Sequence, residues 1–323
     1  MSIQIIYLIL AFIFTALLGK IVIPMLKKLK VGQSEREDGP RSHLKKQGTP
    51  TMGGIMMIMC IIVFTAVVCL ISKDAETIKT LLIISIATLG FGIVGFVDDF
   101  KKVVLHNTEG LNPKLKMLGL LIVSGIYTLI LLKYTNITTE LIIPFTDFKL
   151  MLPNWAFIPF TIVVMLAATN AVNLTDGIDG LAASVSAIMI TAISIIAIKL
   201  GNPAISIFGA IVVGACAGFL VYNFHKAKVM MGDTGSLLLG GVISSMAIYL
   251  QIPIFLLIIA IIPVVETLSV ILQVMYFRKT GKRLFRMSPL HHHFELTGWR
   301  ENRVVGVFSL VTLIFSVVGI LAI

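Results

Sequence analysis

Residues 78–102 read IKTLLIISIATLGFGIVGFVDDFKK, and this stretch indicates the fold class. Within residues 78–97 the only charged side chain is Lys79. A run of ~20 apolar residues is what a helix needs to cross the hydrocarbon core of a bilayer. Asp98 and Asp99 follow the run directly. Because ionisable side chains at the edge of a membrane span are costly, this pair marks a candidate functional site.

The rest of the chain has the same character. Of its 323 residues, 57% are hydrophobic and only 13% are charged, which excludes a soluble globular domain. Long apolar runs predict helices, so the expected fold is an all-α integral membrane protein with one membrane domain over residues 1–323. We predict ten transmembrane helices, at roughly 3–23, 52–72, 78–97, 115–133, 155–173, 179–199, 204–222, 236–251, 254–277 and 303–322. The first is interpreted as a span and not as a removable signal peptide, because no basic residue precedes it.

Lysine and arginine orient these helices. Of the 26 basic residues, 21 lie in or beside the loops that follow the first, third, seventh and ninth spans. The positive-inside rule places that side in the cytoplasm and both termini outside it. The net charge of +10 is therefore a topology signal, and it does not predict nucleic-acid binding.

The unusual polar residues gather on the same cytoplasmic side, where five distant loops meet. We therefore predict an active site at the cytoplasmic mouth of the helical bundle. The loops are residues 48–54, 98–102, 173–180, 231–236 and 289–293.

Asp98 and Asp99 end the third span. Neighbours on a helix point ~100° apart, so we expect two different roles, one on a metal ion and one on a proton. The alternative is a solvated helix end paired with Lys101 and Lys102. Acidic residues oppose the dipole at a helix C-terminus, which favours a functional role.

A second polar group follows the fifth span. Asn170, Asn173 and Asp176 recur every three residues, with Asp179 three residues further on. This spacing places them on one helical face, where they could hold a ribose, a phosphate or a metal-bound water. Helix capping by Asp176 and Asp179 is the alternative, but it leaves the two asparagines unexplained.

Gly232 and Gly235 flank Asp233 just before the eighth predicted span. Glycines let a backbone approach a ligand closely, although an aspartate here could also be a simple N-cap. With Asp98 and Asp99, Asp233 completes a set of carboxylates suited to Mg²⁺.

Histidines and lysines supply the remaining candidates. His291, His292 and His293 are consecutive, so they splay apart and suit contacts to a phosphate or sugar better than a zinc site. Lys114 and Lys116 begin the fourth span and could neutralise phosphate.

The ninth predicted span contains Pro263, followed by Glu266. Proline inside a helix removes a hydrogen bond, so we expect this helix to be kinked. Glu266 has two open interpretations, a proton or ligand site and a polar clamp between helices.

Five segments together resemble the bacterial phospho-N-acetylmuramoyl-pentapeptide transferase family, also called translocase I. This family is a branch of the polyprenyl-phosphate hexosamine-1-phosphate transferases. The segments are GTPTMGG (48–54), VDDF (97–100), NLTDGIDGL (173–181), MGDTGS (231–236) and PLHHHFE (289–295). The unbroken histidine run and the 48–54 stretch look more like the muramoyl branch than the N-acetylglucosamine branch.

The resemblance implies transfer of phospho-MurNAc-pentapeptide from its UDP carrier to undecaprenyl phosphate, which yields lipid I and UMP in peptidoglycan synthesis. It also implies a homodimer, a cytoplasmic site and a place in the bacterial cytoplasmic membrane. Metal binding by Asp233 with Asp99, and service to the acceptor phosphate by Asp98 and Asp99, are further implications. The residues implied in substrate binding are Lys46, Thr51, Lys114, Asn170, Asn173, Asp176, Asp179, Met230, Gly232, Gln273, His291, His292 and His293.

Met230 is a departure, because family members often carry an aromatic residue there. A methionine offers uracil only a softer sulfur–ring contact.

Two mechanisms remain open at this level. In one, the acceptor phosphate, oriented or deprotonated by Asp98, attacks the donor phosphorus directly. In the other, an aspartyl-phosphate forms first. A cation-coupled transporter using Asp98, Asp99 and Glu266 is the alternative function, but transport sites usually lie at the bilayer midplane.

Overall fold

The computed structural model describes residues 2–28, 48–103 and 110–323. Almost all of the described chain is helical, as expected for apolar segments that must satisfy their own backbone hydrogen bonds. The helices are α1 (Ile3–Lys28), α2 (Gly54–Ile71), α3 (Ala75–Val103), α4 (Pro113–Tyr134), α5 (Asn154–Thr175), α6 (Leu181–Lys199), α7 (Pro203–Asn223), α8 (Gly232–Tyr249), η2 (Pro253–Phe255), α9 (Leu256–Ile259), α10 (Ile261–Thr280), α11 (Leu290–Leu296) and α12 (Glu301–Leu321).

Nine helices within the described ranges are long and apolar enough to cross a membrane. They correspond to nine of the ten predicted spans. The remaining one, residues 236–251, falls on α8, which is 18 residues long and begins with the polar sequence GDTGS. The number ten therefore stays a prediction, while the multi-span helical architecture agrees with the sequence.

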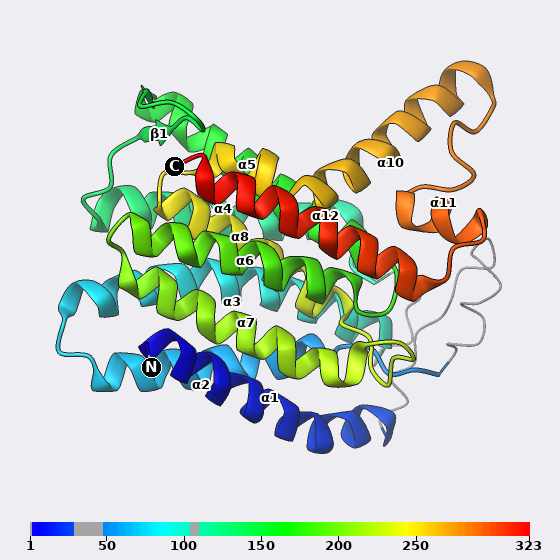
Figure 1. Ribbon diagram of the computed structural model, residues 1–323, viewed down its shortest axis with the longest axis horizontal. Helices are drawn as coiled ribbons and strands as arrows, with labels where there is room; N and C mark the ends of the chain where they lie inside the picture. Colours follow the sequence, from blue (N-terminus) through cyan, green and yellow to red (C-terminus); the bar gives the residue numbers. More distant parts are fainter. Residues whose placement is uncertain (1, 29–47, 104–109) are drawn as a thin grey trace.

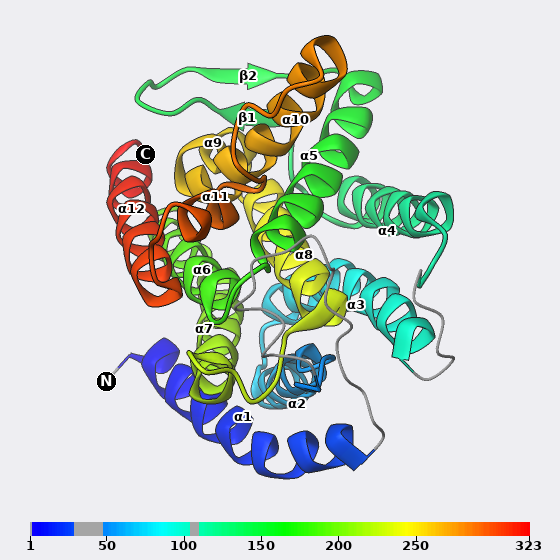
Figure 2. The same ribbon diagram turned by 90° about the vertical axis from the view of Figure 1, so that its right-hand side faces the viewer.

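α8 occupies the centre of the bundle. Every residue from Thr234 to Tyr249 is buried, and α3, α5 and α6 pack against this helix (Figure 2). α7 packs against α6 and, on its other side, against α1. A central helix without a lipid-facing side can carry glycine and serine, because its neighbours exclude both water and lipid. Its first turn is thereby held at one end of the bundle.

One short segment departs from the all-α expectation. Residues 140–151 form a two-stranded antiparallel hairpin, β1 (Glu140–Ile142) and β2 (Lys149–Met151), with Leu141 opposite Leu150. Figure 1 shows this hairpin at the same end of the bundle as both chain termini, with α11 at the opposite end. The two termini therefore share one end, and which side of a membrane that end faces stays a prediction.

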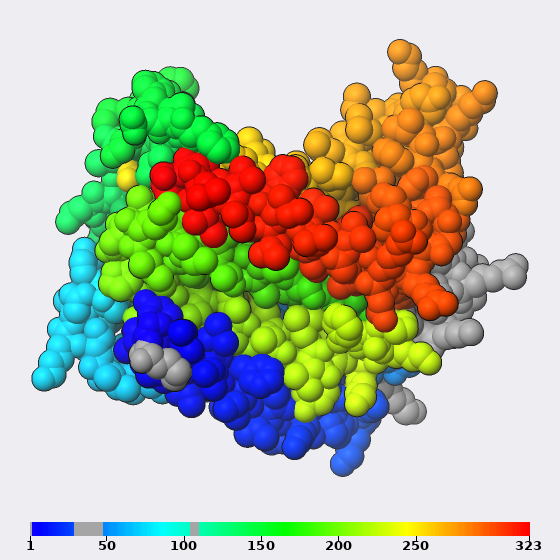
Figure 3. Space-filling model, in the orientation of Figure 1, coloured from blue at the N-terminus to red at the C-terminus, as the bar shows by residue number. Residues whose placement is uncertain are grey.

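α10 leans away from the other helices (Figure 1), and the space-filling view shows a notch between it and the hairpin end (Figure 3). The chain changes direction at Ala260, where φ is −96° and ψ is 33°, between α9 and α10. Pro263 stands in the first turn of α10, where a missing N–H leaves no helical hydrogen bond unmade. The kink predicted inside this span stays a prediction, and the observed change of direction at Ala260 lies three residues before the proline.

Candidate active site

Asp99 holds the start of α8. Its Oδ1 accepts a hydrogen bond from the backbone N–H of Asp233 at 3.1 Å. Its Oδ2 accepts from the N–H and the hydroxyl of Thr234, at 2.8 and 2.6 Å. Met231, the N-cap residue of α8, makes no side-chain capping bond, so α3 supplies the cap that α8 lacks. Buried at 3% exposure, Asp99 is thus a structural acceptor for the first turn of α8.

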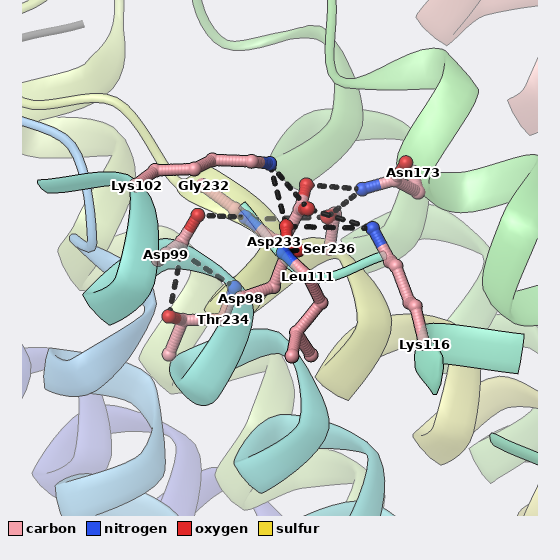
Figure 4. Close-up of polar contacts among 10 residues, drawn as sticks. All are labelled: Asp98, Asp99, Lys102, Leu111, Lys116, Asn173, Gly232, Asp233, Thr234 and Ser236. Carbon is pink, nitrogen blue, oxygen red and sulfur yellow. Dashed lines mark hydrogen bonds and ion pairs between the residues drawn. The ribbon is translucent and has the colours of Figure 1, made fainter. Parts of the chain in front are cut away.

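Asp98 faces the other way, toward two lysines (Figure 4). Lys102, one turn further along α3, pairs with Asp98 and donates to Asp233 Oδ2 at 3.0 Å. Lys116 of α4 donates to the same oxygen of Asp233 at 2.7 Å and lies 3.7 Å from Asp98. The backbone N–H of Leu111 donates to Asp98 Oδ1 at 2.8 Å. Two carboxylates and two ammonium groups therefore form one cluster. Asp98 and Asp99 point in different directions, as their positions on one helix predicted.

Asn173 completes the setting of Asp233. Its side-chain amide donates to Asp233 Oδ1 at 2.7 Å and to the Ser236 hydroxyl at 2.8 Å. Burial alone would raise the pKa of the Asp233 carboxyl. The hydrogen bond with Asp98 and the charges of Lys116 and Lys102 outweigh burial and hold that pKa well below its usual range. Asp233 is therefore a firmly ionised ligand.

Asp176 and Asp179 lie in the turn between α5 and α6. Neither caps α6, because Gly180 precedes that helix and no side-chain cap is present. Asp179 accepts the N–H of Ala227 at 3.0 Å. Burial, followed by the charges of Asp233, Asp99 and Asp179, raises the pKa of Asp176 to about 8. The capping alternative thus fails, and Asp176 lies within the electrostatic reach of the carboxylate cluster.

The three histidines have separate environments. His291 is fully buried, with Nδ1 3.1 Å from an oxygen of Glu266. His292 pairs with Glu295 at 3.0 Å. His293 accepts the N–H of Arg286 on its Nδ1 at 3.1 Å. Only His291 is connected to the turn at 173–180, through Gly177, where an added Cβ would lie 2.0 Å from Nε2.

The other candidates divide between the site and its surroundings. Gly232 has φ +72°. A Cβ added at this position would lie 2.5 Å from Asp99 Oδ2 and 2.8 Å from the Thr51 hydroxyl. Gly232 and Thr51 therefore both lie beside the carboxylate cluster. Met230 is buried and pairs through its backbone with Pro50 and Gly53. Lys46 lies outside the described residues.

Three candidates make no contact with the carboxylate cluster among the contacts of the described residues. Asn170 donates to Leu166 of its own helix. Gln273 holds the backbone of residues 284 and 285. Lys114 is exposed, and Lys116 takes the place expected for it beside Asp233.

Lys102, Thr234 and Ser236 were not chosen as site residues from the sequence. The i,i+4 spacing of Asp98 and Lys102 and the i,i+3 spacing of Asp233 and Ser236 were available signals.

Two groups of described residues could hold a metal ion. In one, an oxygen from each of Asp98, Asp99 and Asp233 lies within 4.8 Å of the others. In the other, a carboxylate oxygen from each of Asp179 and Glu301 and a ring nitrogen of His225 lie within the same distance of one another. The three carboxylates of the first group are hard oxygen donors that fit Mg²⁺. Asp99 and Asp233 each accept three hydrogen bonds from described residues, whereas Asp98 accepts one, from Leu111, beside its pairing with Lys102. Asp98 therefore has the freest oxygens of the three.

Comparisons with known proteins show the family of the chain. The model of glycosyl transferase family 4 matches residues 81–251, just over half of the chain. A phospho-N-acetylmuramoyl-pentapeptide-transferase of Clostridium botulinum (strain Eklund 17B / Type B) is 48% identical over 315 residues, covering 98% of this chain and 95% of the relative. One of Halalkalibacterium halodurans is 48% identical over 317 residues (97% and 95%).

A third relative, from Bacillus subtilis (strain 168), carries the same name and is 47% identical over 313 residues, with 97% of this chain and 95% of its own length covered. Matches at this level extend over all five quoted segments. The chain belongs to the phospho-N-acetylmuramoyl-pentapeptide-transferase family.

Proposed function

We propose that this protein transfers phospho-MurNAc-pentapeptide from UDP-MurNAc-pentapeptide to undecaprenyl phosphate, giving lipid I and UMP. The observation that carries the proposal is the cluster of Asp98, Asp233, Lys102 and Lys116 at one end of the bundle. Phosphoryl transfer needs positioning and charge neutralisation more than covalent help, and this cluster supplies both signs of charge.

An apolar cavity beside α10 suits the acceptor lipid. It encloses about 250 Å³ between α5, α8, α9 and α10, and its lining includes Val164, Ala168, Leu256, Pro263 and Leu268. Aliphatic walls of this kind bind an isoprenoid chain through burial of apolar surface. We place the first isoprene units of undecaprenyl phosphate here, with the phosphate directed to the carboxylate and lysine cluster.

Mg²⁺ would be held by Asp233 and Asp98, with Asp99 reaching it through its remaining lone pair. When bound, the ion would neutralise charge on the diphosphate of the donor. Asp99 keeps Asp233 in place by capping α8, and Asn173 orients the Asp233 carboxylate. Lys102 and Lys116 neutralise the two phosphate groups as they approach each other.

We propose direct attack by an oxygen of the acceptor phosphate on the donor phosphorus, with UMP leaving. Asp98 is 2% exposed, accepts the N–H of Leu111 and pairs with Lys102. Those contacts suit a residue that orients the lysines and the acceptor better than a nucleophile that must reach phosphorus. An Asp98 phosphoryl intermediate, trapped by rapid quenching with labelled donor, would replace this mechanism with the two-step one.

The donor would lie over the turn at 173–180, between Asp176, Asp179 and His291, with Thr51, Gly232 and Met230 beneath it. The remaining substrate-binding candidates are proposed to contact only the outer parts of the donor. They are Lys46, Asn170, Lys114, Gln273, His292 and His293. Asn170, Gln273, His292 and His293 contact backbone groups or neighbouring side chains, Lys114 is exposed, and Lys46 lies outside the described residues.

The remaining features of the proposal concern the whole chain. We propose a single membrane domain over residues 1–323, with ten spans, both termini outside and the α11 end in the cytoplasm of a bacterium. We also propose a homodimer in the bacterial cytoplasmic membrane, as the family resemblance implies.

Purified protein in detergent, with Mg²⁺ and polyprenyl phosphate, tests the proposal. UMP release from UDP-MurNAc-pentapeptide but not from UDP-GlcNAc, and its loss in EDTA, are the expected results. Release from UDP-GlcNAc alone would move the protein to the sister branch. No release from either donor, together with cation flux in vesicles, would support a transporter.

A further inference from the structure

Glu266 lies in α10 and is 1% exposed. Its two oxygens both reach the start of α11. Oε1 accepts the backbone N–H of His291 at 3.1 Å, and Oε2 lies 3.1 Å from Nδ1 of the same residue. Of the two interpretations open from the sequence, the clamp between helices is the one that the contacts show. Capping α11 needs only the contact with the backbone N–H of His291, so the second contact, with the His291 ring, calls for a separate explanation.

The geometry assigns the proton on that ring. The N–H of His291 can only donate, so Oε1 acts as an acceptor. With both oxygens of Glu266 accepting, the hydrogen of the second contact lies on Nδ1. Which ring nitrogen of a histidine is protonated is set by the hydrogen bond that the other nitrogen makes.

The other nitrogen, Nε2, is directed at the turn between α5 and α6. It is buried and has no hydrogen-bond partner among the described residues. Gly177 is its neighbour, and an added Cβ there would lie 2.0 Å from Nε2. Gly177 stands next to Asp176 and two residues before Asp179. A buried nitrogen without a hydrogen-bond partner among the described residues thus borders the turn over which the donor is proposed to lie.

We propose that Glu266 is a positioning residue that fixes His291 in the tautomer protonated on Nδ1 and so presents Nε2 as a hydrogen-bond acceptor to a hydroxyl of the nucleotide-sugar donor. The substrate side of this inference rests on the proposed function. The tautomer side rests on the protein alone.

The tautomer is measured first. Full-length protein labelled with ¹⁵N-histidine is examined by NMR in detergent, and the His291 signals are assigned by their loss in His291→Gln. One protonated nitrogen at Nδ1 and one bare nitrogen at Nε2 are expected. A proton on Nε2, whether in the other neutral tautomer or in the imidazolium, would overturn the proposal.

Glu266→Gln then reverses the assignment at constant size. Its amide oxygen is still required by the N–H of His291, so its NH₂ group faces Nδ1 and donates. The ring should move its proton to Nε2. With the acceptor lost, kcat/KM for the UDP-sugar should fall about tenfold to hundredfold, because a polar group of the donor is left unpaired. The KM for polyprenyl phosphate should not change. An unmoved proton, or equal effects on both substrates, contradicts the proposal.

Ser269→Ala is the matched control. The Ser269 hydroxyl is buried in the same helix and donates only to the backbone oxygen of Glu266, at 2.6 Å. Its removal should leave both the tautomer and the donor kcat/KM unchanged. A drop equal to that of Glu266→Gln would show that disturbance of α10 is the cause, and would overturn a role through His291.

The double variant separates this inference from general loss of structure. If Glu266 acts through His291, Glu266→Gln with His291→Gln should lose no more activity than His291→Gln alone. Additive losses would contradict that route. If wild-type protein releases no UMP from any donor, the proposed function fails, while the NMR measurement still decides the tautomer.

Discussion

Two carboxylates in this molecule do the same structural task in different electrostatic settings. Asp99 of α3 caps the first turn of α8, and Glu266 of α10 caps the first turn of α11. Beside Asp99, the carboxylates of Asp98 and Asp233 meet two lysines. Beside Glu266, the neighbouring group is one buried imidazole, whose Nε2 has no hydrogen-bond partner among the described residues.

The difference separates two kinds of work. The α3–α8 region concentrates charges of both signs, which suits phosphate groups and a divalent cation. The α10–α11 region holds one hydrogen-bonded pair, which suits recognition of a neutral polar group. In each region the capping carboxylate is fixed, and the functional group is the one next to it. Substitutions can test this division.

Asp233→Asn should have the largest effect. It removes the carboxylate that Lys102, Lys116 and Asn173 all contact, and with it the main proposed metal ligand. UMP release should fall by about 10²–10³-fold, the usual cost of losing one preorganised electrostatic group. Asp147→Asn, in the exposed hairpin loop, is the control and should keep full activity. Retention of more than a third of the activity by Asp233→Asn would exclude a central role.

Asp99→Asn and Asp98→Asn should separate stability from catalysis. An asparagine at 99 has an NH₂ group in place of one carboxylate oxygen, and this group cannot accept from Asp233 or Thr234 at the start of α8. The free energy of unfolding should therefore fall by about 1–3 kcal/mol. Asp98→Asn should lower UMP release about tenfold or more with a smaller change in thermal unfolding. Both variants are followed by melting in detergent and by turnover. If Asp98→Asn melts lower than Asp99→Asn, the assigned roles are reversed.

Lys116→Gln compared with Lys114→Gln tests which lysine serves the site. Lys116 lies 2.7 Å from Asp233, whereas Lys114 is exposed. We expect UMP release to fall about tenfold to hundredfold for Lys116→Gln, as for loss of one charged hydrogen bond, and distinctly less for Lys114→Gln. The reverse order would restore the residue chosen from the sequence.

Apolar length and loop charge predict much of this fold. They are enough for the spans, because a helix in lipid must satisfy its backbone internally. They did not locate the turn at Ala260, which lies three residues before Pro263. A proline ring clashes with the carbonyl four residues earlier, here that of Ile259, and α9 also packs against α12. The hairpin at 140–151 was missed because each of its strands has three residues, too few for a visible alternation.

The site was predictable as a set of segments but not as a set of contacts. The grouping of Asp98, Asp99 and Asp233 agrees with the structure, whereas the contact of Asn173 with Asp233 was not predicted. Lys116 was passed over for Lys114 because a two-residue difference on a helix reverses the face, and the sequence does not show which face meets α3. The pairing of Glu266 with His291 links residues that no local spacing connects.

Asp176 gives the smallest expected effect and the finest test of the charge-rich region. Its pKa of about 8 lies above the ordinary value for aspartate, so the folded protein binds a proton that the unfolded chain releases between roughly pH 4 and pH 8. Stability without divalent ions should therefore fall as the pH rises through that window. Asp176→Asn should flatten the profile, measured as melting temperature in EDTA at pH 5.5 and 8. Mg²⁺ should also flatten it, because an ion on Asp233 cancels part of the charge that raises this pKa. A profile that Asp176→Asn leaves unchanged would place the source of the slope elsewhere.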